Sequence, residues 1–184
     1  MDLQQTPRAA FPGSPEKKQQ SRDAQKVLRL LAQKLKSLGF ERTKPTFFTR
    51  PARYVLEFVH VHKYTFAPTF RVHFGVRVRS DDFRAVHLNG PASNGIPDPE
   101  SPGRGLYDFH FSTGEASWSS CAEDMYQCVK KHGLDWFASV ANPSVLLGAE
   151  SPLTQSARVA LQRELLDASS THISEATQRV LNAA

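Results

Sequence analysis

The sequence contains few cysteines and no long apolar run, and these two scarcities exclude several classes of protein. Two cysteines in 184 residues are too few for a disulfide framework or a four-thiolate zinc site. Apolar runs such as Val145-Leu146-Leu147 fall far short of the roughly 20 residues that cross a bilayer. The first residues also lack the apolar segment of about 7–15 residues found in a secretory signal. We therefore expect a cytoplasmic protein that does not act in a membrane.

The motifs of nucleophilic and phosphate chemistry are absent as well. The sequence has no Gly-x-Ser-x-Gly elbow and no Gly-x-x-x-x-Gly-Lys phosphate loop. The pair Gly103-x-Gly105 has neither a strand before it nor a helix after it. The residues therefore favour a non-catalytic protein, and we expect no cofactor.

The spacing of the two cysteines predicts buried, reduced thiols. Cys121 and Cys128 lie seven residues apart in a predicted helix, which separates their Cα atoms by roughly 10 Å. A disulfide requires Cα atoms within about 7 Å of each other. We therefore expect no bond between them.

Charge is distributed unevenly along the chain. Residues 1–40 contain 8 Lys and Arg against 3 Asp and Glu, residues 41–90 contain 9 against 4, and residues 91–184 contain 6 against 11. The corresponding balances are +5, +5 and −5. This asymmetry permits two interpretations, an anion-binding surface or pairing between the basic and acidic parts of one domain.

Hydrophobic periodicity predicts one α+β domain between two flanking segments. Residues 1–21 are polar and rich in proline, which predicts a disordered tail. Residues 22–148 form the predicted domain, and residues 149–184 a helical extension. The domain begins with a helix over residues 22–38 that ends at Gly39. The apolar stripe of this helix consists of Ala24, Val27, Leu28, Leu31, Leu35 and Leu38.

The period then changes to two, which predicts an antiparallel sheet of about four to five strands. Strands are expected at residues 46–50, 53–63, 70–78 and 106–111. Residues 89–105 are rich in Asn, Gly and Pro, which predicts a long surface loop. We expect the N-terminal helix and the C-terminal helices to pack on this sheet.

Four further helices are expected after the sheet, and one of them is a short helix through Trp136, Phe137 and Val140 that ends at Asn142-Pro143. Ser120 and Glu123 have capping-box spacing, which predicts a helix that ends at Gly133. Ser151-Pro152 predicts the start of another helix, and residues 169–184 predict a last one.

A family resemblance rests on the segment from the end of the first helix through the third strand. Its residues are Leu38-Gly39-Phe40, Thr46-Phe47-Phe48 with Arg50, Leu56-Glu57-Phe58, and the run from Phe70 to Val76. Over roughly residues 24–147 the chain resembles a bacterial family catalogued as domain of unknown function 4304. The resemblance implies an α+β cytoplasmic protein with no assigned activity. The chain departs from the family near Val59 and His73, where the family carries amide side chains.

A first candidate site consists of strand histidines. His60 and His62 are two residues apart, so their side chains point to the same side of a strand. With His73 from a neighbouring strand, and His87 nearby, they could ligate a metal ion. Asp81 and Asp82 follow in the sequence, but no His-Glu-x-x-His set is present. A metal-dependent hydrolase that uses His60, His62 and His73 is therefore one alternative function.

A second candidate site is a basic row on one face of the sheet. Its predicted members are Arg71, His73, Arg77 and Arg79, with Arg50 and Arg53 near them and Arg84 close by. Arginines beside aromatic side chains on a sheet could bind phosphates and stack bases. Nucleic-acid binding is therefore a second alternative, although a salt-bridged face is commoner.

The leading hypothesis is a non-catalytic binding or interaction module, whose partner would be another protein. An immunity-like protein that neutralises a toxin is one concrete version by analogy of class. Nucleic acid is less favoured, because the acidic segment after residue 90 can balance the basic one within the same domain.

Overall fold

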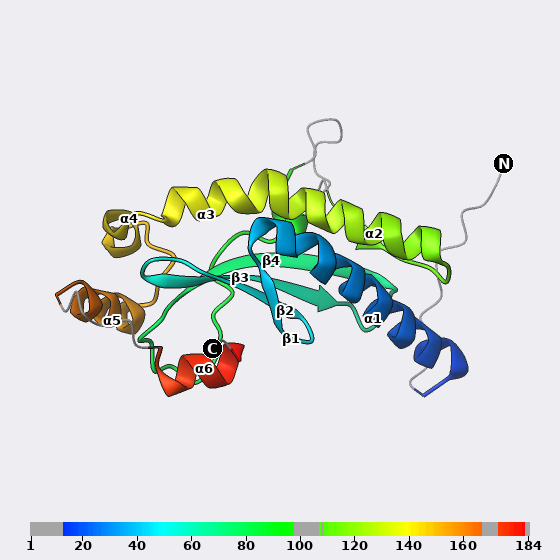
Figure 1. Ribbon diagram of the computed structural model, residues 1–184, viewed down its shortest axis with the longest axis horizontal. Helices are drawn as coiled ribbons and strands as arrows, with labels where there is room; N and C mark the ends of the chain where they lie inside the picture. Colours follow the sequence, from blue (N-terminus) through cyan, green and yellow to red (C-terminus); the bar gives the residue numbers. More distant parts are fainter. Residues whose placement is uncertain (1–12, 98–106, 108, 167–172, 183–184) are drawn as a thin grey trace.

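The computed structural model describes residues 13–97, 107, 109–166 and 173–182, and it confirms the α+β class (Figure 1). Five strands form one antiparallel sheet in the order β1-β2-β3-β4-β5. The strands are β1 (Glu41–Lys44), β2 (Phe47–Pro51), β3 (Val55–Lys63), β4 (Thr69–Val78) and β5 (Phe109–His110). The first four strands follow one another along the chain as an antiparallel meander.

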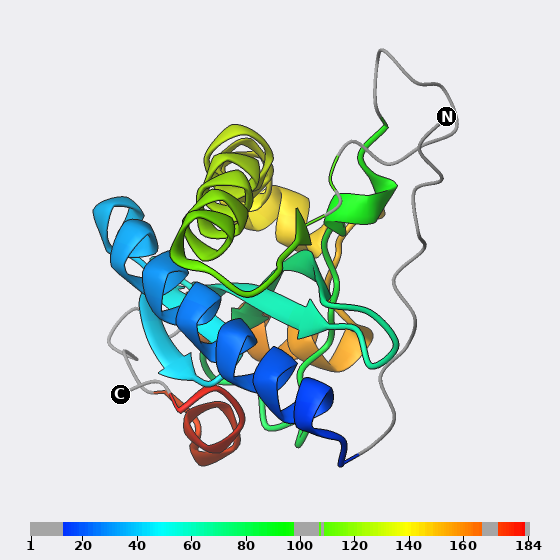
Figure 2. The same cartoon turned by 90° about the vertical axis from the view of Figure 1, so that its right-hand side faces the viewer.

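The helices cover the two faces of the sheet unequally (Figures 1 and 2). On one face, which we call the helix-covered face, lie α1 (Pro15–Leu35), α2 (Glu115–Cys128) and α3 (Leu134–Val140). After α4 (Pro143–Leu147), α5 (Gln155–Leu166) packs against β4 and α6 (Glu175–Leu181) packs on the opposite face. The short helices are η1 (Lys36–Leu38), η2 (Ser93–Gly95) and the π-helical turn η3 (Val129–Gly133).

The main core lies between the sheet and α1, α2 and α3, and its residues follow the predicted periods. The predicted stripe of α1 is buried from Ala24 to Leu35, and Gly39 ends the helical segment with φ +82°. In β4 the alternate residues are buried against the helices. They are Phe70, Val72, Phe74, Val76 and Val78. Such burial contributes roughly 1.5–3 kcal/mol for each large apolar side chain.

Helix α1 begins earlier than the sequence predicted, so residues 15–21 are not part of a disordered tail. Ser14 Oγ accepts a hydrogen bond from the Lys17 backbone N–H at 3.2 Å, and Pro15 occupies the first helical position. Lys17 Nζ donates to the Thr65 carbonyl in the turn between β3 and β4. The prediction failed because this first part of the helix is mostly polar and lacks the apolar stripe. Residues 1–12 lie outside the described part of the chain.

The predicted capping box at Ser120 and Glu123 is wrong. Helix α2 begins at Glu115 after Gly114, so both residues lie within the helix. The Glu123 carboxylate pairs instead with Lys34 Nζ of α1 at 2.6 Å. Gly133 does not end the helix either, because the chain continues through η3 into α3. A Cβ atom at Gly133 would lie 2.9 Å from a ring carbon of Phe74, so glycine allows this close approach to the core.

The described part of the predicted 89–105 loop is attached to the edge of β4. Asn89 uses its side-chain amide as a strand would use its backbone: Oδ1 accepts from the Val76 N–H at 3.0 Å, and Nδ2 donates to the Val76 carbonyl at 2.9 Å. Further along, the Phe74 N–H donates to the Pro91 carbonyl at 3.0 Å. Residues 89–93 thereby satisfy the backbone edge of β4, while residues 98–106 lie outside the described chain.

The C-terminal region packs into the domain. The sequence predicted that the domain ends before residue 149, but the core continues beyond this point. Leu153, Ala157 and Leu161 belong to the main core. Helix α5 begins at Gln155, with the Thr154 hydroxyl accepting from the Ala157 N–H at 3.3 Å, rather than at Pro152. Helix α6 begins at Glu175, after Ser174 as its N-cap.

The structure also bears on the predictions made for the cysteines and for membrane-spanning segments. Cys121 and Cys128 are free and buried, as predicted, and burial raises the pKa of each thiol to about 12. Among the helices of the described residues, none is long and apolar enough to cross a bilayer.

Candidate binding surface

The face of the sheet opposite α1 and α2 is divided into a covered half and an open half. In the covered half, Leu181 of α6 packs with Leu56 and Phe58 of β3 in a small second core. The open half lies toward the turn that joins β3 to β4. It carries partly exposed His60, His62, Tyr64 and Arg71, the exposed Phe66, the nearly buried His73 and the neighbouring Phe47. We call these seven residues the histidine surface.

Strand pairing sets the arrangement of the histidine surface. Phe47, His60 and His73 lie opposite one another on β2, β3 and β4, and His62 lies opposite Arg71. The Phe47 and His60 ring centroids are 4.4 Å apart, and those of His60 and His73 are 6.0 Å apart. Because residues two apart on a strand share a face, these side chains form a continuous aromatic strip.

The two inner histidines are held in their neutral form at neutral pH. Burial lowers the pKa of both His60 and His73 to about 4. Neighbouring positive charge lowers these pKa values further. On His60 it comes from His73, His62 and Arg71, and on His73 from Arg71 and His62. No carboxylate among the described residues counteracts these effects at either imidazole.

Three buried nitrogens of the histidine surface have no hydrogen-bond partner in the described chain. They are His60 Nδ1, Arg71 Nε and His73 Nε2. His73 is only 9% exposed. A buried polar atom without a partner costs about 1–3 kcal/mol, and in native proteins such atoms are rare. Their concentration in one place marks the histidine surface as a region whose polar groups are not satisfied internally.

The predicted metal site is only partly assembled. His60, His62 and His73 do share one face, with the His60 and His62 ring centroids 6.4 Å apart. However, within the described ranges no group of three His, Cys, Asp or Glu side chains is arranged to hold a metal ion. His87 lies elsewhere, where it stacks on Phe83 with centroids 4.6 Å apart.

The predicted basic row does not form one exposed surface. Arg77 is 4% exposed because α6 and residues 81–85 enclose it, so the prediction that it faces solvent is wrong. Arg79 Nε lies 3.3 Å from the Glu164 carboxylate of α5. Arg50 is on the helix-covered face, where it pairs with Glu57 at 2.6 Å.

Two other arginines of the predicted basic surface, Arg53 and Arg71, are not enclosed by other elements as Arg77 is. Arg53 is exposed and its guanidinium lies 5.0 Å from the centroid of the Tyr54 ring. Arg71 remains on the open half of the sheet, and it and His73 are the two members of the predicted row that belong to the histidine surface.

Arg77 instead organises the junction between the sheet and α6. Its guanidinium donates to the Thr177 hydroxyl at 2.6 Å and to the carbonyls of Asp81, Phe83 and Ala85 at 2.7–2.8 Å. It also lies 3.5 Å from the Asp81 carboxylate. Burial lowers the pKa of Arg77, while Asp81 and Asp82 oppose that shift.

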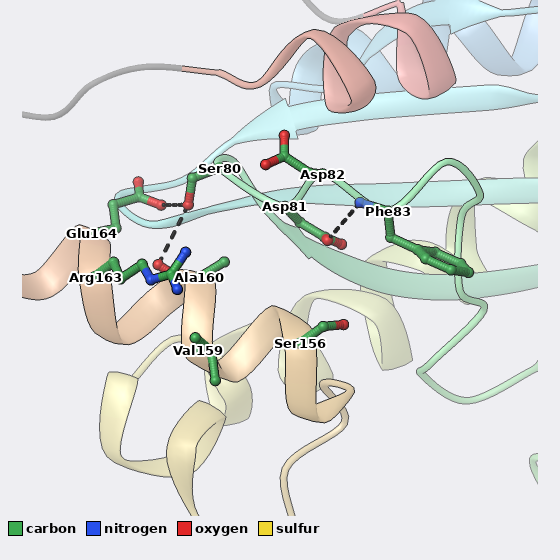
Figure 3. A pocket seen from close by; sticks show the side chains of 9 residues that line it. All are labelled: Ser80, Asp81, Asp82, Phe83, Ser156, Val159, Ala160, Arg163 and Glu164. Carbon is green, nitrogen blue, oxygen red and sulfur yellow. Dashed lines mark hydrogen bonds between the residues drawn. The ribbon is translucent and has the colours of Figure 1, made fainter.

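A cavity of about 460 Å³ lies beside this junction, between the turn after β4 and α5 (Figure 3). Its polar groups are largely paired with one another. Ser80 Oγ donates to the Glu164 carboxylate at 3.0 Å, and the Asp81 carboxylate accepts from the Phe83 N–H at 3.0 Å. The first contact joins the turn after β4 to α5, and the second lies within that turn.

The sequence reasoning missed Tyr64 and Phe66 of the histidine surface. Phe66 is 63% exposed, and its ring centroid lies 5.1 Å from that of Tyr64. The available signal was two aromatic residues in the segment between two strands, where solvent exposure is expected.

No family model matches the chain, and neither a curated protein nor a solved structure matches it.

Proposed function

We propose that this protein is a non-catalytic module that binds another protein through the histidine surface. The observation that carries the proposal is the open half of the sheet, where exposed Phe66 and partly exposed Tyr64 adjoin Arg71 and unpaired buried nitrogens. Aromatic residues and arginine are enriched at the energetically important centres of protein interfaces. An immunity-like protein that binds a toxin would be one form of this function.

The same observations rank nucleic acid below a protein partner. Internal ion pairs involve Arg50, Arg77 and Arg79, so these arginines are not free to contact phosphates. Nucleic-acid affinity depends on several phosphate contacts, and the histidine surface contains only one arginine. The hydrolase alternative is not proposed further, because the described residues lack a suitable group of ligands.

The resemblance to domain of unknown function 4304 stays a prediction. The α+β architecture that it implies is the one observed. The buried free thiols suit a reducing compartment, which supports a cytoplasmic location as part of the proposal.

Selection of random peptides displayed on phage tests the proposal. We expect the selected peptides to bind the wild-type protein and to lose about tenfold or more in affinity when Phe66 is changed to Ser, as at other interface centres. Phe83→Ser is the matched control, since Phe83 is also exposed, at 45%, but lies outside the histidine surface.

Two results would contradict the proposal. One is a set of peptides that bind both variants as well as the wild type. The other is a gel-shift series in which random RNA or DNA binds with sub-micromolar affinity at physiological salt, which would favour the nucleic-acid alternative.

A further inference from the structure

Unlike Arg50, Arg77 and Arg79, Arg71 has no carboxylate partner in the described chain. The others are paired as Arg50–Glu57, Arg77–Asp81 and Arg79–Glu164. The Arg71 guanidinium carbon lies instead 5.6 Å from the centroid of the Tyr64 ring. A guanidinium beside an aromatic ring keeps its planar set of donors available for a carboxylate.

Protonation of the imidazoles near Arg71 would add positive charge beside its guanidinium. His62 lies opposite it in the strand register, and His60 and His73 are the next pair along the two strands. The residues facing these imidazoles from other elements are Phe47 of β2 and Ala92 beside β4, and neither carries charge. The cluster can therefore gain positive charge by protonation, and no described carboxylate acts on its inner imidazoles.

Building on the proposed function, we propose that the histidine surface binds an acidic side chain of the partner protein, whose carboxylate contacts Arg71 while His60 or His73 takes up a proton. The only bond change is a proton transfer, in which an N–H bond forms on the imidazole as an O–H bond of a solvent hydronium ion breaks. The proton comes from solvent and moves to an imidazole nitrogen when the carboxylate arrives.

Charge complementarity is the reason for a carboxylate. A single guanidinium with three imidazoles and aromatic neighbours matches one or two carboxylates within an otherwise apolar contact. A phosphate backbone would leave most of its charges without a partner. Arg71 Nε, His60 Nδ1 and His73 Nε2 are buried without partners, so the described chain does not itself satisfy these polar groups of the cluster.

The direction of the pH effect follows from the free protein. Both inner histidines have a pKa of about 4 when nothing is bound. A carboxylate within about 4–6 Å favours the charged imidazole, which raises its pKa in the complex. Between the free and bound pKa values, each proton taken up tightens binding by as much as tenfold per pH unit. Binding should therefore strengthen as the pH falls from neutrality.

An NMR titration with blocked hexaglutamate tests this inference, with hexaglutamine as the uncharged probe. We expect hexaglutamate to shift the Arg71 Nε–H signal and the imidazole signals of His60 and His73. If the carboxylate raises the imidazole pKa by about 2–3 units, binding should be roughly four- to 25-fold tighter at pH 5.5 than at pH 7.5. The glutamate carboxylates remain mostly ionised at both pH values. Arg71→Gln should abolish the shifts, whereas Arg84→Gln, which removes an exposed charge elsewhere, should preserve them.

Each contrary outcome has a distinct meaning. Equal affinity at both pH values would overturn the proton uptake. Tighter binding of an oligouridylate than of hexaglutamate would overturn the carboxylate and favour RNA. If no anion shifts the wild-type signals, the carboxylate assignment fails, yet peptides that depend on Phe66 would still support the protein-binding function. The wild-type signals provide the readout even if the Arg71 variant fails to fold.

Discussion

Removing the Arg77 side chain should destabilise the fold as strongly as removing a large core residue. The sequence places Arg77 in the basic row, on the face of its strand opposite the alternating apolar residues. In the structure its guanidinium is 4% exposed and bonds to the Thr177 hydroxyl and to three backbone carbonyls. It is one of the connections between the sheet and α6.

The magnitude follows from what the substitution leaves behind. The Asp81 side chain, 8% exposed, loses its cationic partner. Removal of one member of a buried ion pair typically costs 3–5 kcal/mol, roughly the cost of truncating a core phenylalanine to alanine. We therefore expect Arg77→Ala and Phe74→Ala to lower the free energy of unfolding by similar amounts of about 3–5 kcal/mol.

Urea denaturation followed by circular dichroism measures this effect, with Arg84→Ala as the control. Arg84 is exposed, so its removal should change stability by no more than about 0.5 kcal/mol. Hydrogen exchange adds a local readout, since α6 should lose protection in the Arg77 variant before the sheet does. A loss below about 1 kcal/mol in Arg77→Ala, with α6 still protected, would refute the buried-junction reasoning.

Three further predictions test other parts of the structure. Gly90→Ala should lower the free energy of unfolding by about 1–3 kcal/mol, because the new Cβ atom would lie 2.7 Å from the Phe74 backbone oxygen. Gly95→Ala is the control in the same urea assay, and it should be nearly neutral because the space around Gly95 is open. The free energy of unfolding should fall as the pH drops from 6.5 toward about 4, because His73 is protonated in the unfolded chain over this range but stays neutral in the folded protein. Urea titrations across this range should show a weaker pH dependence for His73→Gln. Cys121 and Cys128, with pKa values of about 12, should resist iodoacetamide at pH 8 until urea unfolds the protein, and fast labelling of the native protein would contradict their burial.

The periodic segments were predictable because their burial follows directly from local geometry. A helix and a strand each repeat their buried face at a fixed interval, so the stripe from Ala24 to Leu35 and the alternation from Phe70 to Val78 indicated their elements. Helix starts were less predictable. Ser120 and Glu123 match a capping pattern, but the helix had already begun at Glu115, because a short motif carries no information about the preceding turn.

The candidate site was predictable only in part. Parity correctly placed His60, His62, Arg71 and His73 on one face of neighbouring strands. It could not show that Arg50 lies on the other face, because that depends on how β2 pairs with β3. It also could not show which residues of the face are covered.

The sequence by itself therefore determined the class of fold, the apolar faces of its elements, the reduced state of its cysteines and the absence of known catalytic motifs. Tertiary structure alone decided which polar residues of the sheet are available to a partner. Arg77 and Arg71 look alike in the sequence, both alternating with apolar residues of one strand. Helix α6, about 100 residues away, buries Arg77, whereas Arg71 remains on the open half. The exposure of a side chain depends on elements that are distant in the chain. Local periodicity shows only which face of its own strand or helix a residue occupies, so it cannot predict this exposure.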